Sequence, residues 1–529
     1  MDRPTTWITT FQEMSEEEKQ HSLGMLIQNS DMESRRTLKT LVEPFFKKDF
    51  LRLLPKEISL QILKHFTAND LSKIAFTSKT WNILSEDVGI WKNLCRVDDI
   101  KLLPPLIARS LGWKNWVKPV KDDDSNKGPC RAILSTPLCT PEHTRSDPDA
   151  ESKQQLQVCY DRCTWKAEYL RARRTRINWN KGTPTKRCEL RGHQNHVITC
   201  LHVHTNIIVT CGDDNTLKIW DPVDGSCRFT LDRHSGGVWT SELSPDGKIL
   251  ISGSTDRTVK VWNTETGQLI HELTGHSSTV RCMALNKKIL VTGSRDCTLR
   301  VWNIETGKLI KVLHGHLAAV RCVQFDGERI ISGAYDYFVK VWNVETGMCI
   351  HNLVGHSNRV YAVLFDPVND IIVSGSLDTT IMIWCARTGH PLQTLVGHQS
   401  LTSDMILRGE TLISGNADAT IKIWNIKSGE CIHTLSGENK HASAVTCVKL
   451  VDNKYIASSS DDGTVKLWCA KSGVHIQDLL KLDTAGNGGC IWKISTTDTM
   501  LIAAVGSRGN NQTEDTRVIM MDFDAGYPE

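Results

Sequence analysis

The chain has 529 residues, of which 40% are hydrophobic and 23% charged, values of an ordinary soluble protein with room for two or three domains. The formal net charge is only +3, so the molecule has no global field for nucleic acid or anionic lipid, and anion binding would need a local basic cluster. No apolar run approaches the roughly 18–20 residues of a membrane helix, and the amino terminus lacks a secretory-signal pattern. We therefore expect a protein of the nucleus or cytoplasm that binds no membrane.

The 18 cysteines are expected to be free thiols. Several recur at one repeat position inside apolar runs, which is typical of small buried side chains in a reducing compartment: Cys200, Cys282, Cys322 and Cys447. The close pair Cys159 and Cys163 lacks a second pair at zinc-ligand spacing, so we expect no structural metal and no cofactor.

The first segment, residues 1–48, is predicted to form two amphipathic helices. Ser15 and Glu18 have capping-box spacing, Asp31 can open the second helix, and Pro44 is expected to end it. Because the segment is too small to bury a core, it should pack on the next domain or on a second copy of itself.

Residues 49–98 carry a helical apolar pattern. Leu54, Ile58, Ile62 and Phe66 recur every four residues, with Pro55 where a first helical turn tolerates it. Asn69 or Asp70 can cap a following helix. The series Leu-Pro-x-Glu-Ile, Asp-Leu, Trp-x-x-Leu and Ile-Trp closely resembles an F-box, although a plain small helical bundle would share its apolar spacing.

Residues 99–184 are interpreted as a linker. Its part 121–160 shows no periodicity and is expected to be a disordered insert. The stretch that follows, with Trp165 and Tyr169 among the basic residues Arg171, Arg173, Arg174 and Arg176, looks helical. We favour a solvated connector helix over a nuclear-localisation or nucleic-acid patch, because no aromatic interleaving suggests base stacking.

The remainder, residues 185–529, is dominated by a repeat of about 40 residues. Tryptophans recur at 40- to 44-residue intervals, each following a histidine by 26 to 28 residues. The tryptophans are Trp220, Trp262, Trp302, Trp342, Trp384, Trp424 and Trp468, and the histidines are His193, His234, His276, His316, His356, His398 and His441. Each unit parses as four short strands, the signature of a β-propeller blade.

The recurring polar residues of a unit are expected to be structural. In the best-formed unit, His276, Thr292, Asp296 and Trp302 can form a hydrogen-bonded chain, because buried polar groups persist only when paired. The unit resembles a WD repeat, although Trp-Asp itself occurs only at Trp220-Asp221 and is Trp-Asn or Trp-Cys elsewhere.

An eighth, degenerate blade is predicted after Trp468. The segments CIWKIS, MLIAAVGSR and RVIMMDFD read as three strands, and KRCELRG before the first repeat can supply the fourth. The expected fold is therefore mainly β, an eight-bladed WD-repeat propeller preceded by an all-α F-box and linker helices, with seven blades as the alternative.

Comparison of the repeats with one another indicates where function lies. At the third residue of the innermost strand the series reads Ile198, Trp239, Arg281, Arg321, Tyr361, Ser403, Thr446 and Trp492. Just before the turn Asp it reads Asp213, Thr255, Arg295, Tyr335, Leu377, Ala417, Asp461 and, in the eighth blade, Arg508. In a blade these two positions should lie side by side, so Arg281, Arg295 and Arg321 should converge, with Arg257 nearby. Like charges this close need a counter-anion, and the arginine fork matches phosphate oxygens.

An F-box followed by this propeller resembles the archipelago-type (cell-division-control) F-box and WD-repeat receptors of SCF ubiquitin ligases, and GHQSLTS, SSDDGTVKLW and AVGSR make the resemblance specific. It implies that the F-box docks on the Skp adaptor, joining cullin and RING subunits, through residues Leu54, Pro55, Ile58, Leu71, Trp81 and Trp91. It implies that the propeller binds a phosphothreonine-proline degron of protein substrates, with Arg281, Arg295 and Arg321 cradling the phosphate. Supporting or second-phosphate contacts would come from Thr255, Arg257, Ser278, Thr279, Tyr335 and Arg508, and Trp239, Tyr361 and Leu401 would flank the peptide.

The resemblance of the first 48 residues to the family's dimerisation region is loose and implies a homodimer. No P-loop, nucleophile elbow or HExxH motif is present, so we expect a non-catalytic receptor subunit. A receptor for an unphosphorylated signal, or a scaffold or RNA-associated propeller, are the alternatives.

Overall fold

A computed structural model of the chain describes residues 3–46, 49–100, 164–194, 196–204, 206–483, 489–507 and 515–525. It comprises two compact units, one containing residues 1–102 and 120–169 and the other residues 103–119 and 170–529. The insert expected at 121–160 and the side chain of Arg508 lie outside the described residues.

The amino-terminal segment forms three helices rather than the expected two: α1 (Arg3–Glu13), α2 (Glu16–Gln28) and α3 (Met32–Phe46). The predicted capping box is confirmed, since the Glu18 N–H donates to Ser15 Oγ at 3.3 Å and the Ser15 N–H donates to the Glu18 carboxylate at 2.9 Å. The Asp31 carboxylate accepts from the Ser34 N–H at 3.0 Å and so opens α3 as expected. The expectation that Pro44 ends this helix is wrong, because α3 continues to Phe46.

The F-box region consists of α4 (Phe50–Leu53), α5 (Lys56–Leu63), α6 (Ala68–Ile74), α7 (Lys79–Ser85) and α8 (Val88–Val97). The cap of α6 is Thr67, not Asn69 or Asp70, since the Thr67 hydroxyl accepts from the Asp70 N–H and the Asp70 carboxylate bonds back to Thr67. The core holds Leu51, Leu63, Ala68, Leu71, Leu84, Ile90 and Trp91. Trp165 and Tyr169, from the start of helix α11 (Thr164–Lys181), pack against this core.

Residues 170–181 of α11 belong to the second unit. There Arg171 forms two hydrogen bonds to Asp524, at 2.7 and 2.5 Å, and Trp179 stacks on Phe523 with ring centroids 4.0 Å apart. Arg176 pairs with Asp452 at 2.5 Å. Two of the arginines considered for a nucleic-acid patch are therefore occupied by carboxylates of the propeller.

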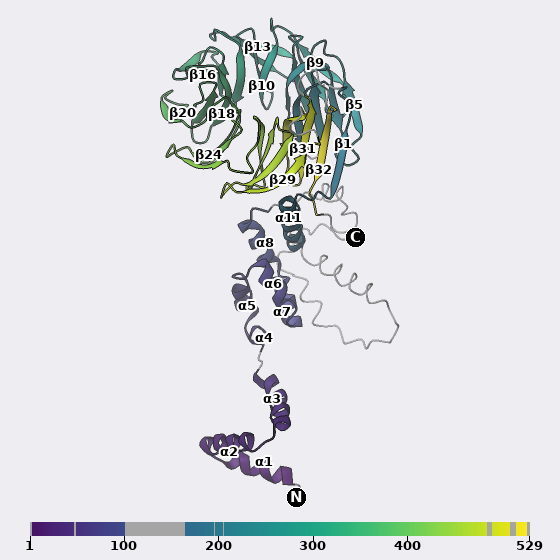
Figure 1. The fold of residues 1–529 in the computed structure, drawn as a ribbon, viewed down its shortest axis with the longest axis vertical. Coiled ribbons are helices and arrows are strands. Elements are labelled where there is room, and N and C mark those ends of the chain that lie inside the picture. Colours follow the sequence, from purple (N-terminus) through teal and green to yellow (C-terminus); the bar gives the residue numbers. More distant parts are fainter. Residues whose placement is uncertain are drawn as a thin grey trace. The chain divides into compact units, whose positions relative to one another are not determined.

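The second unit is a ring of eight four-stranded antiparallel sheets (Figure 1). Blade 1 is β2 (Ile198–His204), β3 (Ile207–Gly212), β4 (Leu217–Trp220), β5 (Cys227–Leu231); blade 2 is β6 (Val238–Leu243), β7 (Ile249–Ser254), β8 (Val259–Asn263), β9 (Leu269–Leu273). Blade 3 is β10 (Val280–Asn286), β11 (Ile289–Ser294), β12 (Leu299–Asn303), β13 (Lys308–Leu313); blade 4 is β14 (Val320–Phe325), β15 (Arg329–Ala334), β16 (Val339–Asn343), β17 (Cys349–Leu353). Blade 5 is β18 (Val360–Asp366), β19 (Ile371–Ser376), β20 (Ile381–Cys385), β21 (Pro391–Leu395); blade 6 is β22 (Thr402–Arg408), β23 (Thr411–Asn416), β24 (Ile421–Asn425), β25 (Cys431–Leu435). Blade 7 is β26 (Val445–Val451), β27 (Tyr455–Ser460), β28 (Thr464–Cys469), β29 (His475–Lys481).

Blade 8 confirms the predicted closure and the count of eight. Its sheet has the order β1-β32-β31-β30, built from β1 (Lys186–Leu190), β30 (Gly489–Thr496), β31 (Met500–Ser507) and β32 (Arg517–Asp522). β1 pairs antiparallel with β32 from Lys186↔Asp522 to Leu190↔Val518. The inner strand of each blade contacts the inner strands of both neighbours, so the ring is closed.

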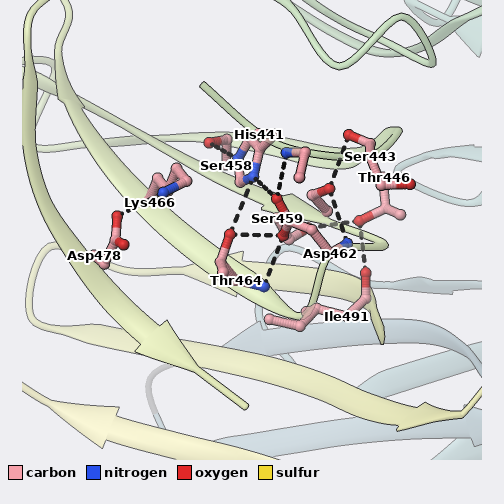
Figure 2. Close-up of polar contacts among 12 residues, drawn as sticks. His441, Ser443, Thr446, Ser458, Ser459, Asp462, Thr464, Lys466, Asp478 and Ile491 are labelled. Atoms are coloured by element: carbon pink, nitrogen blue, oxygen red, sulfur yellow. Dashed lines mark hydrogen bonds and ion pairs between the residues drawn. The ribbon is translucent and has the colours of Figure 1, made fainter. Parts of the chain in front are cut away.

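The repeated polar residues form the predicted chain inside each of blades 1–7. In blade 7, His441 Nδ1 lies 3.0 Å from the Asp462 carboxylate and His441 Nε2 lies 2.8 Å from Ser458 Oγ (Figure 2). Ser458 Oγ also accepts from the Trp468 Nε1–H at 2.9 Å. His276, Thr292, Asp296 and Trp302 make the same contacts in blade 3, at 2.8 to 2.9 Å. Because both ring nitrogens of each histidine have a hydrogen-bond partner within the blade, these histidines hold strands together and are not free to act as ligands or bases.

Candidate functional site

All eight inner strands carry a β-bulge at the same place. In each, the pairing with the second strand skips one residue, which leaves the ladder so that its side chain is re-aimed. The bulged residues are Thr199, Trp239, Arg281, Arg321, Tyr361, Ser403, Thr446 and Trp492. This is the series predicted from the sequence except in blade 1, where Ile198 is paired with Gly212 and the bulged residue is Thr199.

Three of the bulged residues have a structural role. Thr199 donates its hydroxyl to the Val238 carbonyl, Ser403 donates to the Val445 carbonyl at 2.6 Å, and Thr446 donates to the Ile491 carbonyl at 2.6 Å. Each bond crosses to the next blade, and that of Thr446 is drawn in Figure 2. A small hydroxyl residue at the bulge therefore ties neighbouring blades together.

The other five bulged residues are large, and four of them belong to one continuous run of blades, 2 to 5. The Arg281 guanidinium lies over the Trp239 ring at 4.3 Å, and that of Arg321 lies 6.0 Å from the centre of the Tyr361 ring. The rings of Tyr335 and Tyr361 are 5.3 Å apart. The arginines are thus interleaved with aromatic faces instead of being tied to the neighbouring blade by a hydroxyl.

The second series predicted from the sequence lies beside the bulges, as expected. The Thr255 N–H donates to the Gly237 carbonyl at 2.9 Å, the Arg295 N–H to the Thr279 carbonyl at 2.9 Å, and the Ala417 N–H to the Leu401 carbonyl at 2.9 Å. Each acceptor stands two residues before the bulge in its own blade and directly before the strand that carries the bulge.

This repeated bond places the residue that follows the second strand of a blade against the residue that precedes its first strand. Thr255, Thr279, Arg295, Tyr335 and Leu401 therefore lie at the same edge of the ring as the bulged residues. The Ser278 carbonyl joins them by accepting from the Ser294 hydroxyl at 3.0 Å. Arg257 is exposed in the turn that follows Thr255, with a positive φ of 72°.

Arg281 is close enough to the other two predicted cradle arginines to feel their charge. Burial lowers the pKa of Arg281, and the positive charges of Arg321 and Arg295 lower it further, while Tyr335 acts in the opposite direction. Burial raises the pKa of Tyr335, against the nearby charges of Arg321 and Arg281. Within the described part of the chain no carboxylate forms an ion pair with any of the three arginines. They form an uncompensated positive cluster with aromatic walls.

Two residues of this edge were not among the predicted site residues. Arg359 stands two residues before the bulge in blade 5, and its guanidinium lies over the Tyr335 ring at 5.0 Å. Trp492, the bulged residue of blade 8, is 6% exposed, and its buried Nε1–H has no hydrogen-bond partner among the residues that the structure describes. A third comparison of repeats, at the position of Thr279 and Leu401, would have found Arg359 from the sequence.

The predicted adaptor-binding residues differ in burial. Leu71 and Trp91 are 0% and 1% exposed and form the F-box core, and Leu54 and Trp81 pack partly against it. Trp81 also donates from Nε1 to Asp49 at 2.8 Å. Pro55 and Ile58 are exposed.

Further apolar side chains are exposed in the same unit, including Leu53 and Phe76, the latter 91% exposed. The accessible apolar surface of the F-box is therefore carried by residues that the sequence patterns did not single out, together with Pro55 and Ile58.

Comparison with known proteins identifies the class. The family "WD domain, G-beta repeat" matches seven segments between residues 184 and 469, and the family "F-box-like" matches residues 51–97. The chain is similar to the F-box/WD repeat-containing protein sel-10 of Caenorhabditis elegans, with 46% identity covering 98% of this chain and 86% of that protein. The chain therefore belongs to the F-box/WD-repeat protein family.

More distant matches are consistent with this family. Cell division control protein 4 of Saccharomyces cerevisiae is 29% identical over 49% of this chain and 29% of its own length. The probable E3 ubiquitin ligase complex SCF subunit sconB of Arthroderma otae is 29% identical over 37% of this chain and 26% of its own length. Among solved structures, the computationally designed Ika8 protein matches 63% of this chain and 98% of its own chain, with 32% identity and a TM-score of 0.56.

Neither a metal site nor a membrane-spanning helix is found among the residues that the structure describes. No group of three or more His, Cys, Asp and Glu side chains among them is arranged to hold a metal ion. No helix among them is long and apolar enough to cross a membrane.

Proposed function

We propose that this protein is the substrate-recognition subunit of an SCF-type E3 ubiquitin ligase and that its propeller binds phosphothreonine-proline segments of other proteins. The observation that carries the proposal is the cluster of Arg281, Arg295 and Arg321, three like charges at one edge of the ring, none of which has a carboxylate ion-pair partner among the described residues. Such a cluster favours a bound anion, because the anion removes the repulsion between the arginines.

The residues around the cluster favour a phosphate on a peptide over a free ion. Guanidinium groups offer paired N–H donors that match phosphate oxygens. The faces of Trp239 and Tyr361 beside them suit the apolar ring of a neighbouring proline. Thr255, Ser278, Thr279, Arg257 and Arg508 would serve a second phosphate or an acidic residue, and Leu401 would contact an apolar residue before the phosphothreonine.

The test is binding of a peptide that contains phosphothreonine followed by proline. Arg295→Ala should weaken binding roughly ten- to hundredfold, because it removes charge-assisted hydrogen bonds of about 1.5–3 kcal/mol. The matched control is Arg387→Ala, which removes one positive charge from an exposed side chain in the turn after β20. Equal affinity for the phosphorylated and plain peptides, or unchanged binding by Arg295→Ala, would exclude the proposal and favour an unphosphorylated signal.

The F-box region is proposed to dock on the Skp adaptor, which would bring cullin and RING subunits to the captured substrate. Because Leu71 and Trp91 are buried, their role would be to shape the docking surface, and direct contact would fall to Pro55, Ile58, Phe76 and Leu53. Phe76→Ala should reduce co-purification of the adaptor but leave phosphopeptide affinity unchanged. Trp239→Ala should give the opposite pair of results, and loss of both activities in either variant would contradict this division.

Ubiquitin transfer would be performed by the partner subunits, and this chain would supply specificity without a chemical step of its own. The amino-terminal helices are proposed to form a homodimer contact, since Trp7, Met25, Leu26 and Met32 are exposed there and α2 buries no residue. Light scattering of the full chain and of a chain lacking residues 1–46 should then differ by a factor of two in mass. A nuclear or cytoplasmic location would suit this role.

A further inference from the structure

Blade 4 departs from the other blades at three exposed or partly exposed positions beside the arginine cluster. Leu317 follows the blade histidine, where the other blades have Gln194, Ser235, Ser277, Ser357, Gln399 and Ala442. Tyr337 follows the turn Asp, where the others have Asn215, Arg257, Cys297, Thr379, Ala419 and Gly463. Phe338 comes next, where all the others have a threonine: Thr216, Thr258, Thr298, Thr380, Thr420 and Thr464.

These three residues form one surface, called here the blade-4 shelf. The Leu317 N–H donates to the Asp336 carboxylate at 2.8 Å, which places Leu317 against the turn that carries Tyr337 and Phe338. Leu317 is 83% exposed and Tyr337 is 45% exposed. An exposed leucine alone is common on protein surfaces, but apolar residues at adjacent positions of one blade, where its six counterparts are mostly small or polar, are not.

The residues of the blade-4 shelf lack a hydrogen bond that stabilises the same turn in the other repeat blades. In blades 1–3 and 5–7 the turn threonine donates its hydroxyl to the turn Asp at 2.6 to 2.9 Å, and Phe338 of blade 4 gives up this bond. The left-handed conformation of Tyr337, with a φ of 76°, adds nothing to this cost, because its counterparts in the other repeat blades, such as Arg257 and Thr379, adopt it as well, at 72° and 71°. The lost hydroxyl bond at Phe338, together with the exposed apolar Leu317 and Tyr337 beside it, indicates a contact outside the turn.

The position of the shelf indicates what that contact is. The loop that begins at Leu317 continues to Ala319, whose carbonyl accepts from the Tyr335 N–H at 3.0 Å, and then to Arg321. The shelf and the cradle are therefore built from the same two segments of blade 4. Arg321 and Arg359 border this region with positive charge, Arg359 over the Tyr335 ring at 5.0 Å. The complementary partner is an apolar side chain on a chain that is itself acidic or phosphorylated.

We propose that the blade-4 shelf is a specificity site that binds an apolar side chain of the same substrate, outside the residues that contact the phosphate and the proline. The proposal rests on the proposed phosphopeptide function and adds a substrate feature to it. The occupant is a leucine, isoleucine, methionine or phenylalanine that lies beyond the phosphothreonine-proline core. A substrate with this feature would be preferred over one that has the phosphorylated core alone.

The experiment compares a short phosphothreonine-proline core peptide with extended peptides in which a single leucine is moved through flanking positions of a Gly-Ser background. For the wild-type protein, leucine at one or a few positions should raise affinity roughly three- to tenfold, as expected for partial burial of one apolar side chain. The double variant Leu317→Ser, Tyr337→Asn uses residues that the other blades place there, so it should fold, bind the core peptide normally and lose the gain. Val396→Thr, which changes an exposed apolar residue preceding the histidine of blade 6, is the matched control and should keep the gain.

The outcomes separate the two proposals. If the wild-type protein binds the core peptide no better than its unphosphorylated form, the phosphopeptide function fails and the shelf fails with it. If the core peptide binds but no leucine position raises affinity, or the gain persists in the double variant, the shelf alone is overturned. A second measurement is the thermal midpoint of Phe338→Thr, which should rise because the turn hydrogen bond is restored; a fall would mean that Phe338 is kept for packing and would contradict the argument.

Discussion

At the bulge, a single repeated position serves two different purposes. In three blades the bulged residue donates a hydroxyl to the neighbouring blade: Thr199, Ser403 and Thr446. At the same bulge, Arg281 and Arg321 present a positive charge instead. Since the bulge frees the residue from the ladder, its side chain can be exchanged without disturbing the strand pairs on either side. Stability and binding are therefore assigned to different blades of one architecture.

This division predicts opposite effects of two substitutions at equivalent positions. Thr446→Val should lower the free energy of unfolding by about 1 kcal/mol, because the Ile491 carbonyl loses its hydroxyl donor, and should leave phosphopeptide affinity unchanged. Arg281→Thr should abolish the cradle while keeping or raising stability, since it removes charge repulsion with Arg321 and Arg295. Urea denaturation and peptide titration of both variants would test this, and a strongly destabilised Arg281→Thr protein would contradict it.

A second residue-scale prediction concerns acid stability. Burial alone would raise the pKa of Asp462, but hydrogen bonds from His441, Thr464 and Ala442 outweigh it and place the pKa well below its ordinary value of 3.8. Asp256, Asp296, Asp378 and Asp418 behave alike. A lowered folded-state pKa contributes stability that is present above pH 3.8 and is lost as the pH falls below it.

The free energy of unfolding should therefore lose little of this contribution between pH 7 and 5 and lose it steeply below about pH 4. Asp462→Asn should cost about 1–3 kcal/mol at pH 7 and should flatten the decline below pH 4. Denaturant midpoints at several pH values would measure both effects. A variant whose stability falls as steeply as that of the wild-type protein below pH 4 would show that Asp462 is not responsible.

At the scale of elements, the repeated strands could be predicted well because the histidine, aspartate and tryptophan of each blade recur at a regular spacing in the sequence. The register in which the first and second strands of a blade pair was harder to predict. Counting residues from an assumed strand start placed Ile198 in the bulge series, but pairing with Gly212 shows that Thr199 leaves the ladder. A bulge is a property of two paired strands, so one strand's sequence does not reveal it.

Helix ends and the accessible F-box surface were missed for a similar reason. Thr67, Asn69 and Asp70 are all good capping residues, and only the reciprocal bond between Thr67 and Asp70 decides among them. Apolar patterns select core residues, so Leu71 and Trp91 were found whereas the exposed Phe76 was not.

The pairing of β1 with β32 gives a prediction at this scale. Leu190→Asp would place a charge at a position that is 2% exposed in the apolar cluster shared by blades 8 and 1. We expect a loss of more than 3 kcal/mol and increased protease cleavage near residue 190. Val223→Asp, at an exposed site, is the control; equal thermal midpoints for the two variants would mean that β1 adds little to the ring.

For the whole molecule, the small net charge makes the salt dependence of binding informative. Because the chain carries a formal charge of only +3, sensitivity to ionic strength must come from the local arginine cluster and not from a general field. Phosphopeptide affinity should fall severalfold between about 50 and 500 mM salt, where the Debye length shortens from roughly 14 to 4 Å.

The same titration with Arg321→Gln should show a clearly smaller dependence, since one of the three charges is gone. Substitution of the exposed Arg387 should not change the slope. Salt-independent binding by the wild-type protein would mean that the phosphate is recognised mainly by neutral donors.

The closure of blade 8 has a consequence for how the protein is made. β1 leaves the ribosome before any complete blade, yet its pairing partner β32 is synthesised only after all the strands of blades 1–7. Until then the nascent propeller is an open arc with an unpaired strand edge and uncovered apolar faces at blades 1 and 8. A chain truncated before residue 517 lacks β32, so its β1 would keep an unpaired edge and the apolar faces of blades 1 and 8 would stay uncovered.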